Sequence, residues 1–86
     1  PTGEINLIEV DGDTAPYLTI SFRRQLAATD LTYTVELSDH LENWNPNTAV
    51  QVSSSDNGDG TATETWRAPM PTTLNPAQFV RLRITN

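Results

Sequence analysis

Ser38, Asp39 and His40 are consecutive residues whose side chains could together perform nucleophilic catalysis. In a catalytic triad the serine, histidine and aspartate come from separated positions that meet in the fold. Adjacent side chains point in different directions, and His40 is the only histidine of the chain. The sequence therefore favours a turn here, with Asp39 capping the residues that follow, and it predicts a protein that is not an enzyme.

Asp56, Asn57 and Asp59, in the run SSDNGDG, are candidate ligands for a metal ion. Calcium takes roughly six to eight oxygen ligands, usually from closely spaced aspartates and asparagines. When Gly60 is aligned with the glycine of an EF-hand, Trp66 stands where that motif needs a bidentate glutamate. The EF-hand pattern therefore fails and a glycine-rich hairpin is favoured. A looser calcium-stabilised loop stays open as the alternative, and no other cofactor is expected.

Tyr17, Glu64 and Trp66 are the candidate contacts for a carbohydrate. Carbohydrate-binding sandwiches stack sugar rings on exposed aromatic side chains, and the other aromatic residues near the centre of the chain are expected in the core. The favoured interpretation is that Trp66 is partly buried and closes one end of the fold, with the sugar contact as the alternative. Glu64 shares the face of Trp66 in the expected strand, which is unusual for a buried face.

Six segments alternate apolar and polar residues with the period of two that is typical of half-buried strands. They are residues 5–10, 17–23, 31–38, 49–53, 61–67 and 79–85. Turn-forming residues separate them, and only residues 24–30 allow as much as one helical turn. The pattern predicts an all-β, antiparallel two-sheet sandwich of six to seven short strands, with residues 1–86 forming a single domain. A doubly wound α/β fold is excluded because no segment supplies its crossover helices.

The segment from Leu31 to Trp44 is expected to organise the core, with Trp44 plugging the space between the two sheets. Alternation and the spacing of the last strand give the predicted core residues. They are Tyr33, Val35, Leu37, Leu41, Trp44, Val80, Leu82 and Ile84. If residues 31–38 lie beside residues 79–85, as the family resemblance given below implies, Glu36 on the outward side faces Arg81 and Arg83. A solvated sheet face is favoured here, and an arginine-lined anion site is the alternative.

Composition excludes several classes of function. The 86 residues hold no cysteine, so disulfides, thiolate metal sites and a catalytic thiol are absent. Eleven acidic residues against five basic ones give a net charge of −6, which argues against binding to nucleic acid or to an anionic membrane. No apolar run approaches about 20 residues, so membrane insertion is not expected. Because the chain begins at Pro1 without a methionine, we expect a piece of a larger protein or a processed product.

The run YTVELSDHLENW, residues 33–44, resembles the motif Y-x-V-E-x-S-x-x-L-x-x-W of small fibronectin-III-like and immunoglobulin-like sandwich domains. The runs LTISFRR, DNGDGT and FVRLRITN also fit that pattern, so the resemblance extends from about Tyr17 onward. Such domains recur in large secreted or surface-attached bacterial proteins. The resemblance implies an extracellular or cell-surface location and a non-catalytic role as a spacer, stalk or assembly unit. The alternative role is a carbohydrate-binding module attached to a glycan-degrading enzyme.

One departure from the family concerns the end of the chain. Type III sandwiches have a seventh strand after the one that FVRLRITN resembles, whereas this sequence stops at Asn86. The resemblance therefore implies an unpaired sheet edge, unless residues 5–10 fill the place. The last strand contains neither proline nor lysine, which usually protect such an edge. We expect partners among neighbouring domains or subunits of the same protein, joined by strand pairing, with a glycan as the other candidate ligand.

Overall fold

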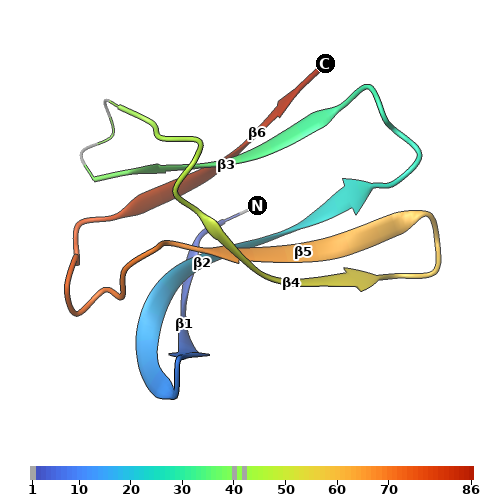
Figure 1. Cartoon of the computed structure of the whole chain (residues 1–86). Helices are drawn as coiled ribbons and strands as arrows, with labels where there is room; N and C mark the ends of the chain where they lie inside the picture. The colour runs from blue at the N-terminus through green and yellow to red at the C-terminus, as the bar shows by residue number, and fades with distance from the viewer. Residues whose placement is uncertain (1, 40, 42) are drawn as a thin grey trace.

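The structure is a computed structural model that describes residues 2–39, 41 and 43–86. These residues form six β-strands in two antiparallel sheets and no helix (Figure 1). The strands are β1 (Glu4–Val10), β2 (Asp13–Gln25), β3 (Thr32–Ser38), β4 (Val50–Asp56), β5 (Thr61–Arg67) and β6 (Phe79–Thr85). The larger sheet has the order β1-β2-β5-β4, and the smaller sheet consists of β3 and β6. The predicted all-β sandwich of two antiparallel sheets is confirmed.

β2 is longer than the sequence predicted and takes part in two different pairings. Residues 13–19 pair with β1, whereas residues 19–25 pair with β5. The sequence predicted a strand only from residue 17 because Ala15-Pro16 resembles the end of a turn. Pro16 lies inside the strand instead, opposite Leu7 of β1, and its carbonyl accepts the N–H of Thr72 at 2.8 Å.

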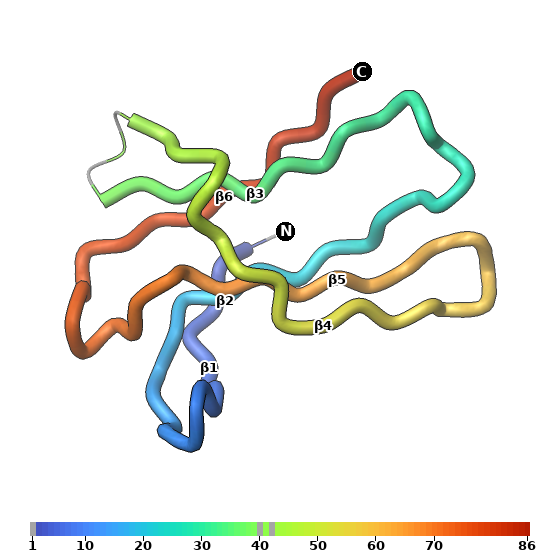
Figure 2. The backbone as a smooth tube through the Cα atoms, in the orientation of Figure 1, coloured from blue at the N-terminus to red at the C-terminus, as the bar shows by residue number. Residues whose placement is uncertain are grey.

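A two-residue turn joins β1 to β2. Asp11 and Gly12 both have positive φ, 53° and 86°, between the paired residues Val10 and Asp13. This is the type I′ geometry that matches the twist of a hairpin, and it favours glycine and aspartate. In Figures 1 and 2 the β1–β2 hairpin projects away from β3 and β6. The radius of gyration is 13.4 Å, against about 12 Å for a compact domain of this length, in agreement with a projecting hairpin.

The core lies between the two sheets and centres on Ile20, Phe22 and Val35. The rings of Phe22 and Tyr33 stack across the sheets with their centres 5.9 Å apart. Partly buried side chains surround this centre: Tyr33, Ala49, Trp66, Val80 and Leu82. Among the predicted core residues, Val35 and Leu37 are buried, and Tyr33, Val80 and Leu82 pack against the core as expected.

Three predicted core positions are wrong. Leu41 is 57% exposed, because the backbone there turns to a φ of 63° and leaves the line of β3. Ile84 is 51% exposed, because it lies near the end of β6, whose outer edge is unpaired among the described strands. Trp44 is only half-buried and lies outside the core cluster; the indole that packs against the core is that of Trp66.

The beginning of β1 brings the two sheets together. A Cβ atom on Gly3 would lie 2.7 Å from Cγ1 of Val80 and 3.2 Å from Cδ1 of Leu18. Gly3 therefore permits a close approach of the β1 backbone to β6 that a larger residue would prevent. As a result, the N-terminal edge of the larger sheet and the free edge of the smaller sheet lie on the same side of the molecule.

Candidate functional site

The outer face of the smaller sheet carries a buried carboxylate. Glu36 is 4% exposed, and its Oε1 accepts a hydrogen bond from Nε of Arg81, directly opposite in the register, at 2.7 Å. Arg83 lies farther away, with 3.9 Å between Nη1 and Oε2. The guanidinium of Arg81 in turn stacks over Trp44, 4.1 Å from the ring centre. The predicted pairing of Glu36 with these arginines is confirmed, but Glu36 is buried rather than solvated.

Glu64 forms a second buried ion pair, on the core side of the larger sheet. It lies opposite Phe22, and it accepts hydrogen bonds from Nε1 of Trp66 at 3.0 Å and from Nη1 of Arg24 at 3.3 Å. Arg24 also lies over the ring of Tyr33, 5.4 Å from its centre. The carboxylate and the indole N–H thus satisfy one another inside the fold, where an unpaired polar group would be destabilising.

Tyr17 and Trp66 lie on opposite faces of the larger sheet. Trp66 is opposite the core residue Ile20, whereas Tyr17 is three residues earlier in β2 and so faces the other way. Tyr17 is buried, and the guanidinium of Arg67 lies 4.8 Å from its ring centre. The three proposed sugar contacts therefore do not form one exposed aromatic surface, and that prediction of the site is wrong.

The loop between β4 and β5 uses its acidic groups within its own turn. Asp56 Oδ1 accepts the N–H of Gly58 at 2.8 Å, and Asp59 Oδ1 accepts the N–H of Thr61 at 3.1 Å. The Thr61 hydroxyl also donates to Asp59, and these hydrogen bonds hold the pKa of Asp59 below its usual value of 3.8. The side chain of Asn57 bonds to both Thr61 and Thr63. The geometry thus favours the hairpin over the calcium loop.

The described residues contain no group of three or more acidic, histidine or cysteine side chains that could hold a metal ion. Of the residues considered for a triad, His40 lies outside the described residues. Ser38 is buried at the end of β3, and its Oγ accepts the N–H of Leu41 at 2.9 Å. The Ser38 hydroxyl thus caps this turn, whereas the cap expected from Asp39 concerns a turn whose residues 40 and 42 lie outside the described residues.

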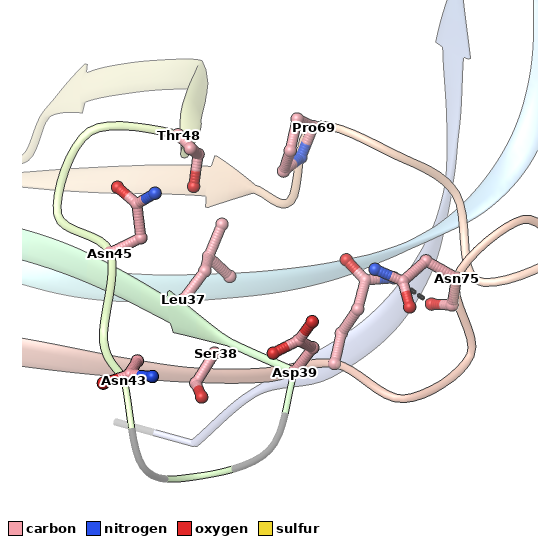
Figure 3. A pocket seen from close by; sticks show the side chains of 9 residues that line it. Leu37, Ser38, Asp39, Asn43, Asn45, Thr48, Pro69 and Asn75 are labelled. Carbon is pink, nitrogen blue, oxygen red and sulfur yellow. Dashed lines mark hydrogen bonds between the residues drawn. The ribbon is translucent and has the colours of Figure 1, made fainter.

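A pocket of about 310 Å³ lies beside the end of β3 (Figure 3). Amide, hydroxyl and carboxylate groups from three separate segments line most of it. The lining residues are Leu37, Ser38, Asp39, Asn43, Asn45, Thr48, Pro69, Asn75 and Gln78. Some of these groups already stabilise loops: Asn45 Oδ1 accepts the N–H of Asn47 at 2.9 Å, and Gln78 Nε2 donates to the carbonyl of Asn75. The sequence did not indicate this pocket because, apart from Leu37 and Ser38 at the end of β3, its residues lie in loops without periodicity.

The outer edge of β6 is the most exposed feature of the smaller sheet. β6 pairs along its whole length with β3, and none of the other described strands lies on its second side. On the other side of the same sheet, β3 is partly covered, because Leu37 and Asn45 exchange backbone hydrogen bonds of 3.0 and 2.7 Å. The predicted edge at the last strand is therefore present in the part of the chain that the structure describes. It exposes Phe79 and Ile84.

β1 forms one edge of the larger sheet and also exposes apolar side chains. Ile5 is 63% exposed and Leu7 is 72% exposed. Ile5 and Leu7 lie on the same face of the chain as the Cβ direction of Gly3, which points toward Val80. They therefore belong to the core side of the larger sheet, but β6 does not cover them. The apolar residues on both faces of this segment were visible in the sequence. Their exposure on a projecting hairpin was not.

β4, at the opposite edge of the larger sheet, differs from the edge strands β6 and β1 in its side chains and in its register. All seven of its residues are exposed, it is rich in serine, and its register shifts between Gln51 and Ser53. A bulge and polar side chains are the features by which natural sheets resist pairing with another chain. The two edges of this sheet are thus unequal: β4 is protected, and β1 is not.

Comparisons with protein-family models, with curated proteins and with solved structures found no match to this chain. The described residues contain no helix that is long and apolar enough to cross a membrane. The role of the protein is therefore inferred from its own residues.

Proposed function

We propose that this chain is a non-catalytic structural module, an assembly unit of a secreted or cell-surface bacterial protein. It joins a neighbouring domain or subunit through a strand that pairs with β6. The location and the kind of protein are carried by the resemblance of residues 33–44 to fibronectin-III-like and immunoglobulin-like domains.

The single observation that supports the joining role is that the two sheets have different numbers of strands. Four strands on one side face two on the other among the described residues, and the two-stranded sheet ends at an exposed edge. An isolated pair of strands is marginally stable, so the β3–β6 sheet depends on packing against its neighbour. A third strand beside β6 would bring the smaller sheet closer to the size of the larger and would satisfy the backbone groups of the edge.

A second observation concerns the chemistry of the interior. The two buried carboxylates, Glu36 and Glu64, are each held by an arginine. Their hydrogen-bonding groups serve the fold, as those of Asp56 and Asp59 serve a turn. This use of the polar side chains supports a structural role.

The proposal can be tested by supplying the missing strand. We would extend the chain after Asn86 with an Asn-Gly turn and seven residues alternating between valine and threonine. If β6 accepts a strand, the extension should raise the melting temperature and protect β6 amides from hydrogen exchange, because the added strand pairs with the free edge.

The matched control carries the same extension with proline at every second position, which removes the N–H groups needed for pairing. It should melt at the temperature of the unextended chain. Equal melting temperatures and equal exchange for the two extensions would contradict the proposed strand acceptor.

A further inference from the structure

We propose that the strand received by β6 is β1 of a second copy of this chain, so that copies associate head to tail. This inference rests on the proposed role of β6 as a strand acceptor and names the partner. Both surfaces are present on one molecule: β6 is an exposed edge, and β1 is an edge strand on a hairpin that projects from the sandwich (Figure 1).

The alternation of the two strands is complementary. β6 places Val80, Leu82 and Ile84 on the core side of its sheet, and β1 places Ile5 and Leu7 on the core side of its own. When two strands join edge to edge, side chains of directly opposite residues share a face. An antiparallel pairing with Ile5 opposite Leu82 therefore sets Leu7 opposite Val80, and the apolar sides of both sheets become continuous.

The charges of the two strands are also complementary in this register. Glu4 of β1 stands opposite Arg83 of β6, on the outer face. The side chain of Arg83 is 61% exposed and lies 3.9 Å from the already paired Glu36, so it remains free to form a closer ion pair. Asp11 and Asp13, at the tip of the hairpin, add to the negative charge of the donor. Opposite charges on paired strands each contribute roughly 0.2–1 kcal/mol.

The competing pairings within the same chain fit less well. Two β6 strands paired with each other in antiparallel would bring the arginines of both copies together. β4 offers a bulged, serine-rich edge with no arginine. β4 also exposes Val50, Val52 and Asp56, but its bulge between Gln51 and Ser53 breaks the regular alternation that pairing along β6 requires, whereas β1 keeps that alternation from Glu4 to Val10.

A contact between β1 and β6 joins two different surfaces, so it is heterologous. Each copy that donates β1 still presents a free β6, and each copy that accepts still presents a free β1. Unless the rotation between copies happens to close a ring, such contacts continue into open filaments. One strand pair buries less area than a standard interface, so the association should be weak and visible only at high concentration.

The experiment is sedimentation equilibrium of the whole chain from about 10 µM to about 1 mM, the range in which small interfaces become populated. The weight-average mass should rise steadily with concentration and pass the dimer without a plateau. Leu7→Lys should abolish the rise, because it places a charge in the apolar contact. Val52→Lys, on the exposed face of β4, is the matched control and should leave the rise unchanged.

A charge exchange identifies the two strands. Glu4→Arg alone and Arg83→Glu alone should each weaken association by about threefold to tenfold, because like charges then face each other. An equimolar mixture of these two variants should regain the wild-type behaviour, since every contact in an alternating filament again joins opposite charges.

A wild-type chain that stays monomeric up to the highest concentration would overturn the inference. The strand-acceptor role would still stand if the valine–threonine extension raises the melting temperature. A plateau at the dimer would exclude head-to-tail growth and would point to a symmetric contact. Equal loss of association in Val52→Lys and Leu7→Lys, or no recovery in the mixed charge variants, would also overturn the assignment of β1 and β6.

Discussion

Glu36 lies on the outer face of a two-stranded sheet, yet it is almost inaccessible to solvent. Its pairing with Arg81 and Arg83 was predicted from the family resemblance, which implies that residues 31–38 lie beside residues 79–85, together with the alternation that puts these side chains on one face. Arg81, which holds this carboxylate, also stacks over Trp44 of the loop that follows β3. Local periodicity contains no information about which loop covers a strand.

The Glu36 pair gives a prediction about stability. Arg81→Met should lower the free energy of unfolding by about 1–3 kcal/mol, because it leaves a buried carboxylate without its hydrogen-bond donor. Arg83→Met is the control and should change it by less than about 0.5 kcal/mol, since that guanidinium is exposed and 3.9 Å away. Urea unfolding of dilute samples measures the free energy of unfolding of both variants. Equal losses would show that the hydrogen bond from Arg81 contributes no more stability than the longer contact of Arg83.

Asp59 gives a prediction about pH. The folded pKa of this carboxyl is lower than its unfolded value, because Thr61 donates two hydrogen bonds to it. The ionised form therefore contributes stability above the unfolded pKa of about 3.9, and this contribution is lost as the pH falls through the folded pKa. Asp59→Asn should lose less stability than the wild type between about pH 5 and pH 2.

Thermal melts across this pH range measure the effect, with Asp30→Asn as a control in a loop that the β4–β5 hairpin does not include. If Asp59→Asn and the wild type lose stability in parallel as acid is added, the hydrogen bonds to Thr61 do not contribute to acid sensitivity.

At the scale of elements, all six strands were predictable, and the errors concerned their lengths. Alternation located each strand, and the glycine–aspartate pairs located two hairpins. β2 was cut short because Ala15-Pro16 has the composition of a turn, whereas pairing with β1 keeps these residues extended. β4 continues to Asp56 because it is paired with β5, although its last residues are serines with no apolar side.

Gly3 gives a prediction at this scale. Gly3→Ala should lower the free energy of unfolding by about 1–3 kcal/mol, because the new Cβ would lie 2.7 Å from a methyl group of Val80. Valine has a stiff χ1 and cannot easily move away. In a Val80→Ala background the same change should cost much less, since the colliding methyl group is gone.

A double-mutant cycle by chemical denaturation gives the coupling between the two positions. Additive effects of the two substitutions would mean that positions 3 and 80 are not in close contact.

At the scale of the whole molecule, the sandwich class followed from the sequence, but which of the two tryptophans packs against the core did not. Trp44 and Trp66 have similar neighbours in the sequence, and either could pack between sheets. The choice is made by the register of β5 against β2, which places Trp66 opposite Ile20 and its N–H beside Glu64. The three sugar-contact candidates failed for the same reason, since the face each residue occupies depends on long-range pairing.

The exposed edges show the same limit. The resemblance implied an unpaired edge at the last strand unless residues 5–10 fill the place, and among the described strands β6 pairs only with β3. The complementary surface on β1 became visible only when the hairpin was seen to project from the body of the protein (Figure 2). The proposed contact was therefore half predictable: the resemblance indicated an open edge at the last strand, whereas the proposed donor strand required three-dimensional placement.

The full exposure of β4 has a consequence for how the molecule opens. A strand without buried side chains can detach from β5 without exposing the core, so its backbone hydrogen bonds should break in brief local excursions. Proteases cleave where extended chain becomes transiently accessible, and residues 50–56 are the segment that meets this condition at least cost. We therefore expect limited proteolysis to cleave within this edge strand of the larger sheet before it reaches the core strands β2 and β5.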